Sequence, residues 1–373
     1  MIKLQEVKNK KDLKAFIKFP FKLYKDSKYW VPPIISQEIK TFNKKENPVF
    51  NDAEARLFIA YKNNTIVGRI AAITNWLEVK DQNIKKMRFG WFDFIDDTDV
   101  SKTLLNKVIE IGKEKNLEYI EGPVGFSNLD KVGVLTEGFE SIAPMVTWYN
   151  HPYYVRHYEA AGLEIEKAYS ESTFPFSNVK PEFFLKAESV IKKRYQLKAL
   201  TFTKTSEVMP YADKMFDLFN ETYSSLSSFV AINDVQKAYF KKKFISFVNP
   251  EYIKFVVDKD DNLIAFAIVM PSFSKALQKA NGKLFPFGFR HILHAKKHSK
   301  DAIFYLIGIH PNYQNKGVQA VIFNEYYHTF KAKGIETCYR TPELEDNIAI
   351  HQIWKRFDPV VYKRRKTFKK YIA

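Results

Sequence analysis

Two pairs of apolar runs, 196 residues apart, follow the same pattern along the chain. Residues 57–73 and 253–269 each contain two alternating stretches around a short polar segment, which predicts two β-hairpins. Each hairpin is followed by a further apolar run, at 88–95 and at 302–309, that is typical of a strand. The matching order indicates an internal repeat.

Each further strand precedes a stretch in which apolar residues recur with the period of a helix. Helices are predicted over 99–115 and 317–333, and short strands over 117–122 and 335–340. The residues that carry the helical period are Val100, Leu104, Val108, Ile111, Val318, Ile322, Tyr326 and Phe330. The predicted fold class is α/β, with a mixed sheet in each of two tandem domains.

The repeat predicts a domain at residues 1–175 and a second at 176–373. Residues 172–183 contain two prolines and no helical stripe, which predicts a linker. Each half closes on an aromatic-bearing helix, one ending at Leu163 and the other at Phe357. The domains differ most in their inserted loops, which are the expected specificity elements.

Composition excludes several classes of protein. The 373 residues are 46% hydrophobic and 27% charged, as in folded proteins. No apolar run approaches about 18 residues, so a cytoplasmic location is expected, with peripheral contact at the inner membrane as an alternative. The one cysteine, Cys338, excludes an internal disulfide and a cysteine-based metal site. HExxH, CxxC, GxSxG and Walker motifs are absent, so no metal is predicted.

The net charge of +17 is unevenly distributed. Residues 1–175 contain 26 basic and 24 acidic residues, whereas residues 176–373 contain 33 and 18. A positive field of this size favours polyanionic partners such as a nucleotide cofactor, anionic lipid headgroups or RNA. DNA is not an expected partner. Charge alone does not distinguish among these partners.

The segment 304–330 holds the main candidate for chemistry. An apolar run breaks at His310-Pro311, passes through a polar loop with one glycine, Gly317, and enters a helix. Backbone N–H groups at such a helix start bind phosphate, and Lys316 adds positive charge. An ordinary strand-to-helix turn is the alternative, and a single glycine does not decide between the two.

This segment resembles the acetyl-CoA-binding motif of the GNAT acyltransferase superfamily, Gln/Arg-x-x-Gly-x-Gly/Ala after a strand that ends in hydrophobic-x-Pro. Ile309-His310-Pro311 match the strand ending, and Gln314 to Val318 match the first five motif positions. Gln319 stands where Gly or Ala is usual. The resemblance implies that acyl-CoA or acetyl-CoA binds as co-substrate through Ile309, Gln314, Asn315, Lys316, Gly317, Val318 and Gln319.

The segment "EDNIAIHQIWKRF" resembles the closing helix of the same superfamily. Asn347 is in place, Trp354 stands where a tyrosine is usual, and Asp358 replaces a glycine. The resemblance implies that Asn347 and Trp354 also contact CoA. Because an indole does not donate a proton at neutral pH, Trp354 does not supply the usual general acid; Tyr326 and Tyr327 are candidate replacements, with a core position as the alternative.

For the base, the candidates are His310, Glu345 and Asp346, or a water that one of them holds. Solvated bystanders are the alternative for each. The equivalent strand exit in the first half is acidic, with Asp96, Asp97 and Asp99. Carboxylates there would repel a nucleotide, so the first half is expected to lack the CoA cradle.

The whole chain resembles tandem GNAT-like bacterial proteins, on segments that include "YWVPP", "GWFDFIDD" and "NHPYYVRHYEAAGL". The first hypothesis is an acyl-CoA-dependent N-acyltransferase that acts on the amine of a small-molecule or lipid-like acceptor. The alternatives are a Fem-like transferase that uses aminoacyl-tRNA and a catalytically inactive ligand-binding or scaffold protein. The basic, apolar insertion 272–300 either covers an acyl chain, contacts an anionic membrane or packs between domains.

Overall fold

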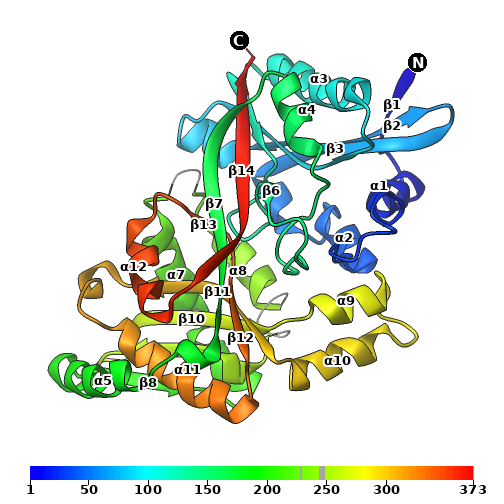
Figure 1. Cartoon of the computed structure of the whole chain (residues 1–373). Helices are drawn as coiled ribbons and strands as arrows, with labels where there is room; N and C mark the ends of the chain where they lie inside the picture. The colour runs from blue at the N-terminus through cyan, green and yellow to red at the C-terminus, as the bar shows by residue number, and fades with distance from the viewer. Residues whose placement is uncertain (227–228, 243–247, 373) are drawn as a thin grey trace. The chain divides into compact units, whose positions relative to one another are not determined.

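A computed structural model describes residues 1–226, 229–242 and 248–372 (Figure 1). The chain forms two compact units. The first comprises Met1–Ser170, Ser274–Ile292 and Tyr362–Ala373, and the second comprises Glu171–Phe273 and Leu293–Val361. The predicted folding domains stay a prediction, because compactness in space does not test independent folding.

The first unit is a mixed sheet with helices on both faces. Its strands are β1 (Ile2–Glu6), β2 (Ala53–Lys62), β3 (Thr65–Asn75), β4 (Lys86–Phe94), β5 (Tyr119–Gly122), β6 (Val134–Glu137) and most of β14 (Val360–Tyr371). Its helices are α1 (Lys10–Leu23), α2 (Ile35–Thr41), α3 (Thr98–Glu114), α4 (Tyr154–Ala160), α9 (Ser274–Ala280) and the start of α10 (Gly288–His298). The strand order is β1-β2-β3-β4-β5-β14, with β6 also on β14. Only β4 and β5 are parallel among the described pairs of this unit.

Two hydrophobic clusters hold this sheet in place. The predicted helical stripe of α3 is fully buried and packs with Tyr154 and Tyr158 of α4. On the other cluster, Phe16 of α1 and Phe42 after α2 pack with Trp91 of β4. The predicted hairpin is confirmed, and its two-residue turn places Asn63 and Asn64 at φ values of 50° and 59°.

A network of buried charges lies along β4 and β5. The guanidinium of Arg88 donates to both carboxylate oxygens of Glu78, at 2.7 and 2.6 Å. The ammonium of Lys86 lies 2.9 Å from Glu78 and 2.9 Å from Glu121. Lys167 donates to the other oxygen of Glu121 at 3.1 Å. Such charges are tolerated inside a protein only because each one is paired.

This network predicts acid-sensitive stability. Burial raises the pKa of Glu121, but Lys86 and Lys167 outweigh burial and lower it from 4.5 to about 2. The group therefore stabilises the fold above its unfolded pKa, and this contribution is lost as the pH falls from 4.5 towards 2. We expect a loss of about 2 to 3 kcal/mol, measured by urea unfolding over this range. Glu121→Gln should make the free energy of unfolding depend less steeply on pH. An unchanged pH dependence would contradict this assignment.

The second unit repeats the plan. Its strands are β7 (Glu164–Pro175, from Glu171 onward), β8 (Lys198–Thr201), β9 (Ile253–Val257), β10 (Leu263–Pro271), β11 (Asp301–Ile309), β12 (Thr337–Arg340) and β13 (Glu343–Leu344). Its helices are α5 (Glu182–Tyr195), α6 (Thr205–Val208), α7 (Ala212–Tyr223), α8 (Asp234–Phe240), α11 (Gln319–Lys333), α12 (Ile348–Trp354) and the end of α10. The order is β8-β9-β10-β11-β12-β7, and β11 and β12 are parallel. Helices α5, α11 and α12 contribute to one hydrophobic cluster.

The predicted linker needs correction. Part of the predicted linker is strand, because Thr173 and Phe174 pair with β12. Pro175 fits there as the last residue of β7, a position at which a missing N–H is tolerated. The basic C-terminal segment forms β14, and not all of its cations are solvated. Lys363 is buried and donates to the carbonyls of Gly138 and Ser141, both at 2.8 Å.

Candidate functional site

Strand β11 opens away from β12 before it ends. It pairs with β10 as far as Ile309, opposite Ala265. In the described part of the chain, its pairing with β12 stops at Phe304, opposite Arg340. A bulge at Tyr305 interrupts the β10 register at this point. The last five residues of β11 therefore have one edge that β12 does not cover.

The backbone of Ile309 faces this open edge. The N–H of His310 donates to the carbonyl of Ile264 on β10 at 2.8 Å. Because neighbouring residues of a strand direct their backbone groups to opposite edges, those of Ile309 point away from β10. The Ile309 carbonyl accepts the side-chain N–H of Gln314 at 3.0 Å, which ties the following loop to the strand. We call residues 309–319 the exit loop.

The exit loop turns sharply into α11. A single 3₁₀ turn, Pro311–Tyr313, is followed by Asn315 at φ 58° and Gly317 at φ 80°. Both lie in the left-handed region, which Asn tolerates and Gly prefers. A Cβ at Gly317 would also lie 2.7 Å from Cδ1 of Ile191 on α5. The backbone conformation therefore favours glycine here, and a side chain would also have to displace the end of Ile191.

The start of α11 has the features of an anion site. Val318 precedes the helix, and no side chain of the described residues caps this end. The N–H groups of Ala320 and Val321 bond to the carbonyls of Gly317 and Val318, at 2.9 and 3.0 Å, which leaves the N–H of Gln319 at the positive end of the helix dipole. The ammonium of exposed Lys316 lies 5.5 Å from the ring centroids of both Tyr195 and Tyr313. These cation–π contacts hold a positive charge within the exit loop.

His310 pairs with an acid that the sequence did not single out. Its Nδ1 accepts the N–H of Asn312 at 3.2 Å, so the neutral ring carries its proton on Nε2. That nitrogen lies 3.4 Å from Oε1 of Glu221 on α7, and the Glu221 side chain is exposed. Glu221 was missed because it lies 89 positions earlier in the sequence, with no local motif. Tyr223 of the same helix donates to the carbonyl of Ile307 at 3.1 Å.

Trp354 and Tyr326 lie in the core of the second unit. Trp354 is 1% exposed, and its ring centroid lies 4.8 Å from that of Phe304 and 5.2 Å from that of Phe323. The Tyr326 hydroxyl is buried against the carbonyls of Tyr252 and Ala267, at 2.8 and 2.9 Å. Burial raises the pKa of Tyr326 well above its ordinary value. We therefore leave both residues out of the proposed site.

The remaining candidate residues follow β12, the strand that is parallel to β11. Asn347 caps α12, where its side chain accepts the N–H of Ile350 at 3.3 Å. Glu345 and Asp346 are exposed on the turn that precedes this helix. Arg340, at the end of β12, contacts Glu343 and donates to Ser172 at 2.9 Å. The structure thus groups the candidates at two strand exits and in the core.

The equivalent exit in the first unit is closed by its own acids. Asp97 caps α3 by accepting the N–H of Asp99 at 3.0 Å, and it pairs with Lys62 at 2.7 Å. The hydrogen bond from Lys62 lowers the pKa of Asp97. Asp96 contacts Arg156 and lies 2.9 Å from Nε2 of His157. These carboxylates stabilise the helix start and oppose an anion there.

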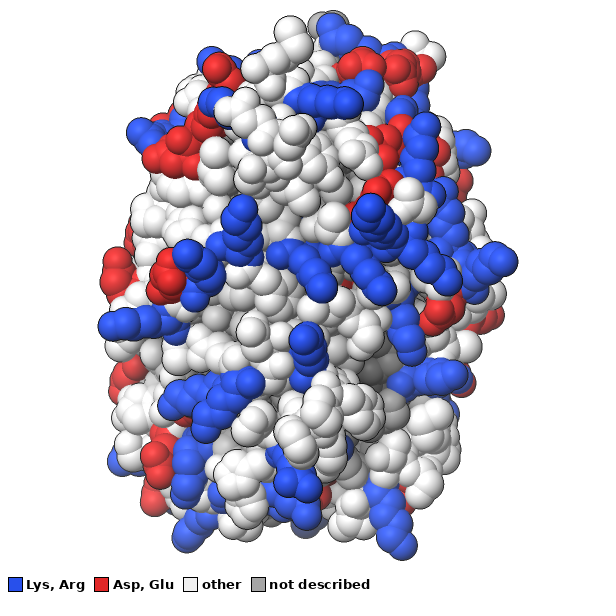
Figure 2. All heavy atoms as spheres, turned by 90° about the vertical axis from the view of Figure 1, so that its right-hand side faces the viewer, with Lys and Arg blue, Asp and Glu red and all other residues white. Residues whose placement is uncertain are grey.

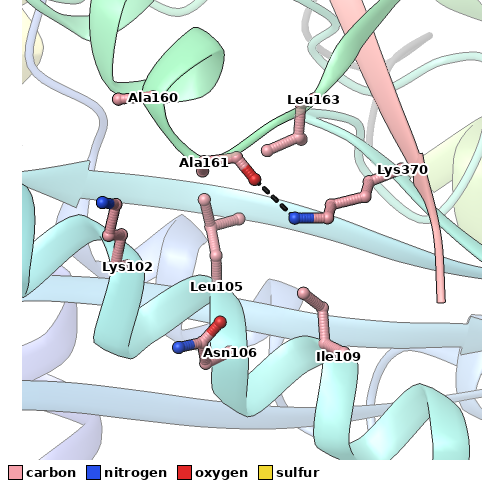
Figure 3. Close-up of a pocket in the computed structure, with 8 residues that line it drawn as sticks. All are labelled: Lys102, Leu105, Asn106, Ile109, Ala160, Ala161, Leu163 and Lys370. Carbon is pink, nitrogen blue, oxygen red and sulfur yellow. Dashed lines mark hydrogen bonds between the residues drawn. The ribbon is translucent and has the colours of Figure 1, made fainter.

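A small pocket of about 210 Å³ lies between α3, the end of α4 and β14 in the first unit (Figure 3). Lys370 enters it and donates to the carbonyl of Ala161 at 2.6 Å. Lys102 and Asn106 line the opposite side. Its volume is below the range of about 300 to 1,000 Å³ that is usual for small-molecule sites, and it holds no predicted site residue.

Within the described ranges, no helix is both long and apolar enough to cross a bilayer. Over the same ranges, no group of three or more His, Cys, Asp and Glu side chains is arranged to hold a metal ion.

Relatives and solved structures identify the architecture. No protein-family model matches the chain. Protein YghO of Escherichia coli K12 is 26% identical over 98% of this chain and 94% of its own length. A bacterial ceramide synthase of Caulobacter vibrioides is 24% identical over 83% of this chain and 80% of its own. A solved tandem GNAT protein from the clavulanic acid biosynthesis pathway matches 100% of this chain and 99% of its own, with a TM-score of 0.60 at 9% identity.

The fold is that of the tandem GNAT proteins. The predicted fold class is therefore confirmed, and the two units are two GNAT-like repeats. In both repeats, the strand that precedes the long helix carries a register shift, near Trp91 in the first and at Tyr305 in the second. Only the second GNAT repeat follows this strand with a basic, glycine-containing turn.

Proposed function

We propose that this protein is an N-acyltransferase that transfers an acyl group from CoA to the amine of a small-molecule or lipid-like acceptor. The observation that supports this most strongly is the exit of β11. An open strand edge there adjoins a helix start without a side-chain cap and a held lysine. A CoA thioester has phosphates at one end and a reactive carbonyl at the other. The helix start and the lysine suit the phosphates, and the open strand edge suits the carbonyl.

Each part of the exit loop has a separate role in this proposal. The N–H of Gln319, with the ammonium of Lys316, would hold the phosphates, whereas Val318 is fully buried and takes no part. Gly317 supplies the left-handed backbone, at φ 80°, that turns the loop into α11. The N–H of Ile309 would donate to the thioester carbonyl and stabilise the negative charge that develops on its oxygen. Gln314 and Asn315 fix the shape of the loop.

The proposal assigns the proton transfer to Glu221 and His310. His310 Nδ1 is occupied by a backbone N–H, so its lone pair is not free to accept a proton. The exposed Glu221 carboxylate, 3.4 Å from Nε2 of His310, accepts the proton that the amine loses as the amide forms. The departing thiolate takes its proton from solvent, because the buried indole N–H of Trp354 does not ionise at neutral pH.

A lipid-like amine is the proposed acceptor. The relative from Caulobacter is named a ceramide synthase, and a ceramide is a long-chain amine carrying an N-acyl group. At 24% identity, that name motivates the choice of substrates for an assay. Long-chain acyl-CoA with a sphingoid base is the first pair to test, and acetyl-CoA with a short amine is the comparison.

Thiol release tests the proposed function directly. Cys338 is buried, and burial raises its pKa, so the protein itself should react little with a thiol reagent. We expect free CoA to appear only when both an acyl-CoA and an amine are present. Binding of acyl-CoAs without thiol release for any amine would overturn the transferase proposal and leave a ligand-binding protein.

Reversing the charge of Lys316 should weaken CoA binding. We expect Lys316→Glu to raise the Kd of CoA about tenfold, because a charge-assisted contact is lost and a repulsion is gained. Titration calorimetry measures the change. Lys259→Glu, at an exposed turn of the same unit, is the matched control and should bind as the unmodified protein does. Equal affinities for both variants would remove Lys316 from the site.

A further inference from the structure

The insertion between β10 and β11 forms a helical hairpin with only positive charge. It consists of α9 and α10 joined by the sequence "NGKLFPF". No Asp or Glu occurs from residue 262 to residue 300, whereas residues 272–300 contain seven Lys and Arg. Figure 2 views the molecule from the side on which α9 and α10 lie in Figure 1, and its lower half shows many basic side chains and few acidic ones.

Helix α9 and the start of the tip are held by hydrogen bonds to other parts of the first unit. The Ser274 hydroxyl donates to the buried carbonyl of Ala143 at 2.9 Å. The Gln278 amide donates to the carbonyls of Lys28 and Trp30, at 2.9 and 3.0 Å. The N–H of Ile35 donates to the carbonyl of Gly282 at 3.0 Å. The hairpin is therefore an ordered part of the surface, and its tip is held in a defined place.

Large apolar side chains are exposed at this tip. Phe285 is 78% exposed and Phe287 is 63% exposed, the two highest values among the described phenylalanines. Phe285 lies 5.7 Å from Phe289, and the Arg290 guanidinium lies 5.5 Å from the ring of Phe287. Contiguous exposed aromatic surface is unfavourable in water and marks a surface that binds a partner.

We propose that this tip docks on an anionic lipid bilayer. Phe285 and Phe287 insert at the boundary between headgroups and acyl chains, a position that aromatic side chains favour. Lys275 and Lys279, four residues apart on an exposed face of α9, contact lipid phosphates with Lys283. The complete lack of acids favours a bilayer over a second copy of the chain, whose matching tip would repel it.

Vesicle flotation tests this docking independently of the acyltransferase proposal. Vesicles contain phosphatidylcholine alone or phosphatidylcholine and phosphatidylglycerol in equal parts. We expect the protein to float with the anionic vesicles and not with the neutral ones. The double variant F285S/F287S should lose about tenfold or more in partitioning, because two inserted rings are removed. The variant K279E/K283E should lose binding in the same way, since it replaces attraction by repulsion.

A matched control removes apolar surface elsewhere. Phe183 and Leu185 of α5 are 45% and 48% exposed, and F183S/L185S should float as the unmodified protein does. The melting temperature of each variant, and its response to CoA in solution, should be unchanged. A loss of flotation then reports lost membrane docking and not a loss of folding or of CoA binding at the exit loop. Equal binding to both kinds of vesicle, or no binding to either, overturns the proposal. The proposal is also overturned if the unmodified protein sediments as a dimer and F285S/F287S sediments as a monomer.

Discussion

Replacing Glu221 by Gln is expected to lower kcat for acyl transfer about 100-fold, the lower end of the effect of losing a general base. The amide keeps the shape of the side chain and its contact with Nε2–H of His310, 3.4 Å away in the native pair. It cannot accept the proton that the amine loses. Because Glu221 lies outside the exit loop, the KM for acyl-CoA should change little. The measurement is steady-state thiol release with a saturating amine.

The control for this variant lies on the same helix. Asp217 is exposed on α7, pairs with Lys237 and precedes Glu221 by one helical turn. Asp217→Asn should retain the native kcat. His310→Asn should lose activity to a similar extent as Glu221→Gln, and the double variant should lose little more, because the two groups act as one unit. A native kcat for Glu221→Gln would contradict the assigned role.

Truncating Trp354 to Ala should lower the free energy of unfolding by about 3 to 5 kcal/mol, the cost of removing a large buried aromatic side chain. Four phenylalanine rings lie within 6.1 Å of its ring centroid, so the cavity has little freedom to collapse. Urea unfolding measures the loss. Truncation of an exposed aromatic side chain to Ala would lower the free energy of unfolding by only a fraction of this amount.

Trp354→Phe separates packing from chemistry. The indole N–H is buried and has no hydrogen-bond partner in the described structure, so Phe loses ring volume and no hydrogen bond. We expect a cost of about 1 to 2 kcal/mol and near-native kcat at a temperature where the variant is folded. A folded Trp354→Phe protein without activity would show that the indole contributes to the reaction.

The repeats could be predicted because their signals are local. The stripe of Val100, Leu104 and Val108 needs only helical period, and burial against the sheet confirms it. The two asparagines between β2 and β3 likewise specify a two-residue turn. The exit loop belongs to this class, since proline, left-handed Asn315 and Gly317 lie within a few residues of one another.

The contacts that complete the site could not be predicted, because they join distant parts of the chain. Glu221 meets His310, and Tyr195 meets Lys316, only after α5 and α7 pack on the sheet. The burial of Tyr326 could not be predicted from the sequence either. Its helical spacing suits both a core position and a reactive one, and only the carbonyl of Tyr252 against its hydroxyl distinguishes them.

The net charge of +17 does not show which basic residues can bind an anion. Lys363 lies in the basic C-terminal segment, but it is buried and donates to the carbonyls of Gly138 and Ser141 in the first unit. Sequence counts every lysine equally, whereas burial decides which of them can meet a phosphate. Lys316 and the lysines of α9 are exposed, and these are the cations on which the two proposals rest.

Thermal shift across CoA, acetyl-CoA and palmitoyl-CoA tests most directly whether the exit loop is a CoA site. We expect all three to raise the melting temperature of the unmodified protein, palmitoyl-CoA most of all, and to do so less for Lys316→Glu. Lys259→Glu should respond as the unmodified protein does. If none of the three ligands moves the melting temperature of the unmodified protein, the exit loop is an ordinary strand-to-helix turn and the account is wrong.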